Sequence, residues 1–191
     1  MRVALAITGA SGLPIAFELL EALEDHEVEA VVTEGALEVA KREPCTLEDD
    51  GCDLIKELAK RRVRVHTTMS SPLASSSRVP DAVVCVPCSM KTVSSAAYGI
   101  ANTLAVRLIL NALRMKRRVV VVPRETPVGV IELEAMRRLA EAGAAVVLPA
   151  LAFYNKPKSL RDAVRFVAGK VLDVLGIEHR LYDKYLSWEA E

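Results

Sequence analysis

The chain has 191 residues, of which 51% are hydrophobic, and its 25 lysines and arginines balance its 25 aspartates and glutamates. This length fits one α/β domain spanning residues 1–191, and the absence of net charge argues against nucleic acid or an anionic membrane as a partner. The apolar runs are much shorter than the roughly 20 residues of a membrane helix, and no signal peptide precedes the first apolar run. We therefore expect a soluble, cytoplasmic protein.

The apolar run Val3–Ile7 predicts a strand that ends at the turn Thr8-Gly9-Ala10-Ser11-Gly12, and a helical pattern begins at Leu13. Glycines permit close backbone approach, and the free N–H groups at a helix N-terminus bind anions. The spacing is G-x-x-G rather than the dinucleotide fingerprint, which favours a mononucleotide or a small phosphate. A turn that serves only chain geometry is the alternative reading of this motif.

Strand and helix patterns then alternate along the whole chain without a hairpin signal, which predicts a doubly wound parallel α/β sheet with helices on both faces. The expected strands are 3–7, 28–33, 63–66, 81–86, 119–122 and 145–148. The expected helices are 13–23, 36–42, 54–61, 93–98, 104–113, 131–142 and 160–175. Residues 67–79 lack periodicity and are expected to form a loop whose hydroxyls either bind phosphate or are simply solvated. The tail at about 178–191 carries Tyr182, Tyr185 and Trp188 and is expected to contact a neighbouring subunit.

Ligands of open parallel sheets bind at the carboxyl ends of the strands, so the loops in that position are expected to converge on one site. The four loops are 9–12, 33–35, 87–92 and 123–127. In the third loop Ser89 can cap a helix, with Thr92 one turn on, which repeats the geometry of the first loop. In the fourth loop Arg124 and Glu125 stand between two prolines, and a surface ion pair is the alternative reading.

The four cysteines form two pairs in the sequence. Cys85 and Cys88 form a C-x-x-C at the end of an apolar strand, but no second pair or nearby histidine completes a zinc site, so no metal is expected. We expect Cys85 to be buried in the sheet and Cys88 to line the site. Cys45 and Cys52 flank a polar loop, and their spacing does not decide between free thiols and a disulfide.

These motifs resemble the UbiX-type flavin prenyltransferases of the flavoprotein superfamily, which have a Rossmann/flavodoxin-like fold. The matching stretches, in the family's order and spacing, are 7–12, 71–77, 86–92, 122–127, 149–157 and 172–177. The resemblance implies an enzyme that joins the dimethylallyl group of dimethylallyl phosphate to reduced FMN across N5 and C6. The product would be prenyl-FMN, the cofactor of a UbiD-type decarboxylase, and the family implies a homo-oligomer, a dodecamer, in which subunits complete each other's sites.

The resemblance also implies roles for individual residues. The catalytic carboxylate falls on Glu43, with Glu125 and Ser11 beside the reacting atoms. FMN contacts fall on Gly9, Ala10, Ser11, Thr33, Ser89, Met90, Lys91, Thr92 and Arg124. Contacts to the substrate phosphate fall on Tyr154, Lys170, Arg107, Arg114, Ser75 and Ser76. Cations and donors on the leaving oxygens, a carboxylic acid and exclusion of water are what ionisation of an allylic phosphate requires, without a metal.

The sequence departs from the family's usual pattern at a few positions, among them Thr33 for serine and Ser76 for glycine, which leaves monophosphate and diphosphate substrates both open. One rival interpretation is an FMN-dependent cysteine decarboxylase, but the three histidines lie outside the four loops and the Asn-containing motif of those enzymes is absent. Another is a non-catalytic subunit that binds or delivers FMN. A carrier has no need of Glu43, Glu125 or Lys170, so we favour the enzyme.

Overall fold

The structure, a computed structural model, describes residues 1–48 and 51–183. Its centre is one six-stranded parallel sheet in the order β3-β2-β1-β4-β5-β6. The strands are β1 (Arg2–Ile7), β2 (Glu27–Val32), β3 (Arg64–His66), β4 (Ala82–Cys88), β5 (Arg118–Pro123) and β6 (Ala144–Val146). In the central pairs Leu5 of β1 stands opposite Ala30 of β2 and Val84 of β4. The strand order reverses beside β1, which is where such sheets open a crevice for a ligand.

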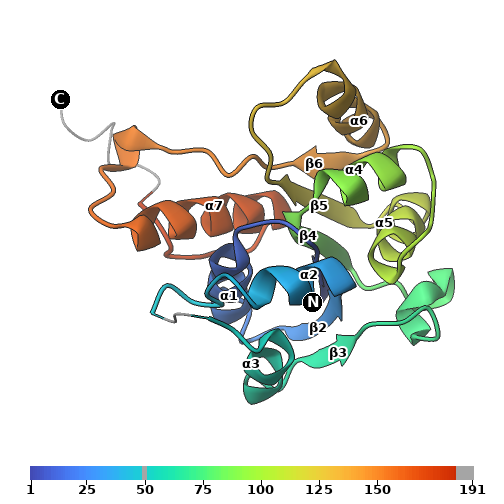
Figure 1. Cartoon of the computed structure of the whole chain (residues 1–191), viewed down its shortest axis with the longest axis horizontal. Helices are drawn as coiled ribbons and strands as arrows, with labels where there is room; N and C mark the ends of the chain where they lie inside the picture. The colour runs from blue at the N-terminus through green and yellow to red at the C-terminus, as the bar shows by residue number, and fades with distance from the viewer. Residues whose placement is uncertain (49–50, 184–191) are drawn as a thin grey trace.

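Helices cover both faces of this sheet, as the sequence predicts (Figure 1). Alternate residues of β1 point to opposite sides, so that Leu5 belongs to the core beneath α1 and α7, and Ala4 to the core beneath α4, α5 and α6. The helices are α1 (Leu13–Ala22), α2 (Glu34–Ala40), α3 (Leu54–Lys60), α4 (Met90–Ala97), α5 (Leu104–Arg114), α6 (Val130–Glu141) and α7 (Leu160–Leu175). The short 3₁₀ turns are η1 (Pro72–Ala74), η2 (Ser76–Arg78) and η3 (Phe153–Asn155).

Helix α7 is fixed against α1 by a mostly buried carboxylate. Glu18 of α1 accepts a hydrogen bond from Arg161 Nε at 2.8 Å and forms an ion pair with Arg165 Nε at 3.3 Å. The Glu18 side chain is only 9% exposed, so loss of either arginine would leave a largely buried carboxylate with one partner fewer. This contact sets the position of α7, which carries Lys170.

Two predicted boundaries differ from the structure for local reasons. Helix α4 begins at Met90 rather than at 93, because the Ser89 hydroxyl accepts a hydrogen bond from the Thr92 N–H group at 3.3 Å and caps the helix there. The serine-rich stretch 67–79 is not entirely irregular, since Ser71 accepts from the Leu73 N–H group at 3.1 Å and starts η1. The other elements lie within a few residues of the predicted bounds.

Cys88 does not line the site, and that expectation is wrong. Strand β4 continues through Pro87 to Cys88, with an irregular register after Cys85, and this buries both cysteines completely on the α4–α6 side of the sheet. Burial raises the pKa of the Cys88 thiol well above its ordinary value. The thiol is therefore protonated and unreactive at neutral pH.

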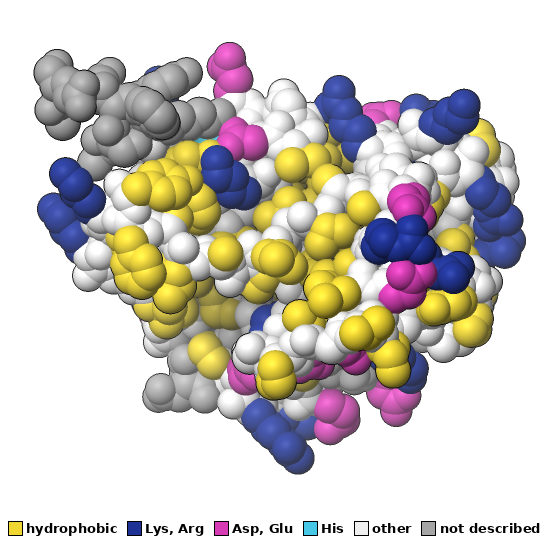
Figure 2. Space-filling view, turned by 90° about the horizontal axis from the view of Figure 1, so that it is seen from above, with side chains coloured by type: hydrophobic (Ala, Val, Ile, Leu, Met, Phe, Trp, Pro, Cys, Tyr) yellow, Lys and Arg dark blue, Asp and Glu magenta, His cyan; other side chains and the backbone are white. Residues whose placement is uncertain are grey.

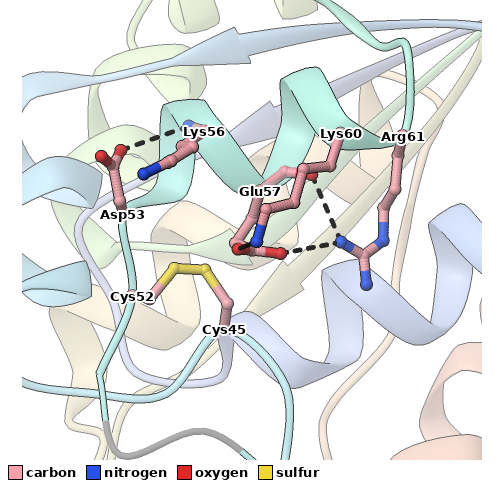
Figure 3. Close-up of a disulfide and its surroundings, with 7 residues drawn as sticks. All are labelled: Cys45, Cys52, Asp53, Lys56, Glu57, Lys60 and Arg61. Carbon is pink, nitrogen blue, oxygen red and sulfur yellow. Dashed lines mark hydrogen bonds and ion pairs between the residues drawn. A yellow bond between two sulfur atoms is a disulfide. The ribbon is translucent and has the colours of Figure 1, made fainter.

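A disulfide joins Cys45 to Cys52, with the two Cα atoms 5.1 Å apart, which decides the question that their spacing left open. Figure 3 shows how this bond links the chain after α2 to the start of α3. There the Asp53 carboxylate caps α3 by accepting from the Lys56 N–H group at 3.2 Å. The Cys52 N–H group also donates to the carbonyl of Ala40, the last residue of α2, at 3.2 Å. Together these contacts tie the C-terminal end of α2 to the N-terminal end of α3.

Within residues 1–48 and 51–183, no helix is long and apolar enough to cross a membrane. Of the tail expected at 178–191, the described part packs on α7 of the same chain, where the Tyr182 ring lies 5.0 Å from that of Phe166. Tyr185 and Trp188 lie outside the described residues. The proposed contact of this tail with a neighbouring subunit stays a prediction.

Candidate functional site

A cavity of about 240 Å³ opens at the carboxyl ends of β1, β2 and β4, where the sequence places the site. Three of the four expected loops contribute to its wall, and the N-terminal ends of α4 and α5 complete it. Its lining residues are Gly9, Thr33, Glu34, Gly35, Ser89, Lys91, Thr92, Asn102, Thr103 and Val106. Five of these ten residues have short side chains with hydroxyl or amide groups. Such a wall suits a polar, hydrogen-bonding ligand.

The hydroxyl of Thr8 connects two of the loops. It donates a hydrogen bond to the carbonyl oxygen of Pro87 at 2.9 Å and accepts one from the Ser89 N–H group at 2.8 Å. Thr8 is 1% exposed, so water cannot replace these bonds. Ser89, held in this way, caps α4 and lies 3.0 Å, oxygen to oxygen, from the Thr92 hydroxyl. One buried threonine thus positions the start of α4 against the end of β1.

Gly9 and Gly35 bring the loops after β1 and β2 into backbone contact. A Cβ atom on Gly9 would lie 3.0 Å from the Cα and carbonyl carbon of Gly35, and one on Gly35 would lie 3.2 Å from the Gly9 Cα. Backbone atoms cannot rotate away as a side chain can, so neither position has room for a larger residue. Gly12, with φ of +116°, makes the tight turn into α1. Gly9 and Gly35 thus allow the two loops to approach each other closely.

The start of α4 has the features of an anion site. The N–H groups of Met90 and Lys91 are in the first turn, ahead of the first intrahelical hydrogen bond, and the positive end of the helix dipole lies there. Ser89, Thr92 and Lys91 belong to the same wall. A phosphate at this point would receive backbone, hydroxyl and lysine donors together.

The remaining expected FMN residues lie near the cavity without lining it. Ala10 is buried, Ser11 and Met90 are half-buried, and Arg124 is exposed. The Arg124 N–H group donates to the Cys88 carbonyl at 3.2 Å, which keeps the loop after β5 beside that after β4. Among the described residues Arg124 and Glu125 form no ion pair with each other. The exposed Glu125 accepts from the Thr126 N–H group at 3.2 Å.

The expected phosphate-binding residues fall into two groups that one chain does not bring together. Arg107 and Arg114 lie on α5 and, with Arg138 of α6, line a second cavity of about 430 Å³. Ser75 and Ser76 adjoin this first group, since Arg107 Nε donates to the carbonyl of Ala74 at 3.2 Å. Tyr154 and Lys170 form the second group, around Phe166 of α7. The sheet separates them, because α5 and α7 pack on opposite faces.

Glu43 lies beyond the end of α2 and is not among the residues that line the cavity. It is half-buried, and its N–H group donates to the Val39 carbonyl at 3.0 Å. The disulfide at Cys45 begins two residues later. Helix α2 starts in the cavity wall at Glu34 and Gly35, so the same short helix that helps to form the cavity also determines where Glu43 stands.

Sequence reasoning missed part of the wall. Asn102, Thr103 and Val106 come from the start of α5, and Thr103 caps that helix by accepting from the Val106 N–H group at 3.2 Å. Asn102 donates to the Ser95 hydroxyl at 3.3 Å, which joins α5 to α4. A polar cap pattern preceding a helix was visible in the sequence. Only the packing of α5 beside β4 brings it to the cavity.

The role of Thr8 can be tested by substitution. Thr8→Val keeps the shape of the side chain but leaves the partly buried Ser89 N–H group without its acceptor, so we expect the free energy of unfolding to fall by about 1–3 kcal/mol. Urea denaturation at fixed protein concentration measures this change. Thr8→Ser keeps the hydroxyl and is expected to retain most of the stability. Equal losses in the two variants would contradict the account.

Comparison with known proteins identifies the family of the chain. The model of the flavoprotein family matches residues 1–172. A flavin prenyltransferase UbiX of Methanocaldococcus jannaschii is 44% identical over 186 residues, which cover 97% of this chain and 98% of the relative.

Solved structures agree with this match. AnUbiX (PadA1), in complex with FMN and dimethylallyl pyrophosphate, has a TM-score of 0.89 and 31% identity over 98% of each chain. A dodecameric FMN-dependent UbiX-like decarboxylase from Escherichia coli O157:H7 has a TM-score of 0.83 and 32% identity over 94% of this chain and 96% of its own. The chain therefore belongs to the flavoprotein family and, within it, to the UbiX-type flavin prenyltransferases.

Proposed function

We propose that this protein transfers the dimethylallyl group of dimethylallyl phosphate to reduced FMN and releases inorganic phosphate and prenyl-FMN. The observation that carries the proposal is the cavity at the strand ends, whose wall combines the α4 N-terminus with the side chains of Ser89, Thr92 and Lys91. These donors fit a phosphate monoester such as that of FMN. FMN supplies the N5 and C6 atoms that become bonded to the five-carbon group.

The cavity accounts for only part of a flavin site. Its volume of about 240 Å³ is below the range of about 300–1,000 Å³ common for pockets that enclose a whole ligand. We infer that the phosphate end of FMN lies at α4 and that the ring extends toward Ser11, Arg124 and Glu125. This places the reacting atoms at the loops after β1 and β5, where Ser11 and Glu125 can contact them.

A second copy of the chain would complete the site. Arg107 and Arg114 cannot reach a phosphate held by Tyr154 and Lys170 of the same chain, because the sheet stands between the two groups. Figure 2 shows hydrophobic side chains spread across one face of the molecule. The large hydrophobic side chains that are between 66% and 83% exposed are Val130, Ile131, Leu151, Phe153 and Leu160. Exposed apolar area of this kind is typical of subunit interfaces, so we propose a homo-oligomer, as in the dodecameric relative.

In this site the cations act on the leaving group. Arginine binds two phosphate oxygens with its fork and lysine contacts one, so Arg107, Arg114 and Lys170 would stabilise the charge that develops as the C–O bond breaks. Glu43 would hold the proton that the departing phosphate takes up. Exclusion of water by the neighbouring copy would protect the allylic cation from hydrolysis. These roles require no metal.

The first test measures the product. Anaerobic incubation of the purified protein with reduced FMN and dimethylallyl phosphate is expected to give a flavin heavier by one C5H8 unit, detected by mass spectrometry. The diphosphate is tested in parallel, since the sequence leaves both substrates open. An unchanged flavin mass with both substrates would contradict the proposed function, and would favour a protein that only binds or delivers FMN.

The second test concerns Glu43. Because general acid catalysis contributes typically 10²–10⁴-fold, Glu43→Gln is expected to lower kcat by about 100-fold or more while FMN still binds. Stopped-flow product formation and flavin titration measure the two quantities. Glu38→Gln is the matched control, since Glu38 is an exposed carboxylate of α2 whose partner is Lys41 at 2.6 Å. Loss of FMN binding in Glu43→Gln would make Glu43 a structural residue instead.

The product would serve a UbiD-type decarboxylase, and the cytoplasm is the location that we propose. Disulfides such as Cys45–Cys52 are rare in most cytosolic proteins, but they are frequent in intracellular proteins of hyperthermophiles. This disulfide therefore does not contradict a cytoplasmic location.

A further inference from the structure

Asp173 lies at the centre of a side-chain cluster on α7 that the sequence motifs did not explain. The Tyr182 hydroxyl donates a hydrogen bond to Asp173 Oδ2, and His179 Nε2 lies 3.1 Å from Asp173 Oδ1. Lys170 Nζ lies 3.6 Å from Asp173 Oδ2, one helical turn away on the same face of α7. One carboxylate therefore contacts two residues of the segment 177–183 and the lysine expected to bind the substrate phosphate.

A glycine lets this segment lie directly on the helix. A Cβ atom on Gly169 would come within 2.5 Å of Cε1 of the Tyr182 ring and within 2.8 Å of Cε1 of His179. Glycine weakens a helix interior, so its presence in the middle of α7 needs a compensating contact. The close packing of Tyr182 and His179 supplies it. The His179 side chain is 2% exposed, which indicates a tightly packed contact.

This packing surrounds the Lys170 ammonium group on several sides. Nζ lies 4.8 Å from the centre of the Tyr182 ring and 5.3 Å from that of Phe166, and the Phe166 ring meets Tyr154 edge to face at 5.8 Å. The neighbouring Tyr182 hydroxyl raises the pKa of Lys170, with smaller contributions from Tyr154 and Asp173, while partial burial opposes the shift. Lys170 thus stays protonated to higher pH than a free lysine.

The contact distances separate two roles for Asp173. At 3.6 Å the Lys170–Asp173 pair is too long for a hydrogen bond, whereas Tyr182 and His179 lie within hydrogen-bonding distance of the carboxylate. Asp173 therefore attracts the Lys170 ammonium group by charge, but at 3.6 Å it accepts no hydrogen bond from it. The Lys170 side chain is 40% exposed, so a phosphate can reach it.

We propose that Asp173 is a positioning residue, which fixes Tyr182 and His179 on α7 and so holds the Lys170 ammonium group beside Tyr154 for the substrate phosphate. The inference rests on the proposed function for the identity of that phosphate. A lysine has a flexible four-carbon stem, and fixing it before the substrate arrives reduces the ordering cost of binding. In the proposed site FMN is held by other residues, in the loops after β1, β2 and β4.

The kinetic test compares Asp173→Asn with Glu178→Gln. Glu178 is an exposed carboxylate on the same segment, so the control removes an equal charge. For Asp173→Asn we expect KM for dimethylallyl phosphate to rise about tenfold and kcat to fall, because Lys170 also acts on the leaving phosphate, while FMN affinity stays within about twofold of wild type. The alkaline limb of the plot of 1/KM against pH is expected to move to lower pH, because Lys170 loses the nearby negative charge of Asp173, which helps to raise its pKa. Tyr182→Phe is expected to raise KM in the same direction by a smaller factor.

Several results would overturn the proposal. An unchanged KM in Asp173→Asn would do so, as would an equal rise in Glu178→Gln. A parallel loss of FMN affinity would show that Asp173 supports the fold as a whole.

A labelling test stays informative if the wild-type protein makes no prenyl-FMN. Trace acetylation of the full chain with acetic anhydride at pH 9, read by mass spectrometry, is expected to modify Lys170 several-fold faster in Asp173→Asn than in wild type. The exposed Lys56 of α3 is the internal reference and should react equally in both. Equal rates at Lys170 would contradict the positioning role, whereas a missing product with faster labelling would contradict only the proposed function.

Discussion

The site depends on the buried hydroxyl of Thr8. Parallel strands end at one edge of a sheet, but they do not by themselves fix the loops that follow them. The Thr8 hydroxyl bonds both the Pro87 carbonyl and the Ser89 N–H group, and so places the α4 N-terminus against the end of β1. Gly9 and Gly35 then allow the loop after β2 to close on the same point. These contacts position Ser89 and Thr92, and the Thr33 N–H group and hydroxyl donate to the Ile7 carbonyl at 3.1 and 3.3 Å, so the polar wall of the cavity depends on a few hydrogen bonds.

A second constraint comes from the sheet itself. It keeps α5, with Arg107, on one face and α7, with Lys170, on the other, and we propose that a phosphate clamp using both residues is built from two copies of the chain. The chain also has a cavity below the usual volume range of pockets that enclose a whole ligand, and it exposes large apolar side chains to solvent. We propose one common explanation for these three features, which is that the complete active site forms between subunits. Catalysis and assembly are then coupled, and residues such as Asp173 matter by fixing the part that one subunit contributes.

Much of the fold could be predicted because the signals are local. The apolar run before Gly9 and the helical spacing after Leu13 specify a strand and a helix without knowledge of the rest. The features that the sequence did not predict depend on which residues come together in the folded chain. The sequence could not decide whether Cys45 and Cys52 pair, and it did not show that packing brings Asn102 to the cavity. Cys88 was misplaced because β4 continues past Pro87 with an irregular register. The site residues carried over from the family, Glu43 among them, stay predictions about chemistry.

Complementation between two variants tests the shared site most directly. Arg107→Ala and Lys170→Ala each remove one cation from a different face of the sheet, and each variant alone is expected to lose most of its prenyl transfer activity. When the two are co-expressed and form mixed oligomers, about a quarter of the sites, by random pairing, would receive both intact residues, and activity should return to that extent. If mixed oligomers form and activity stays at the level of the single variants, the active site is not shared between subunits.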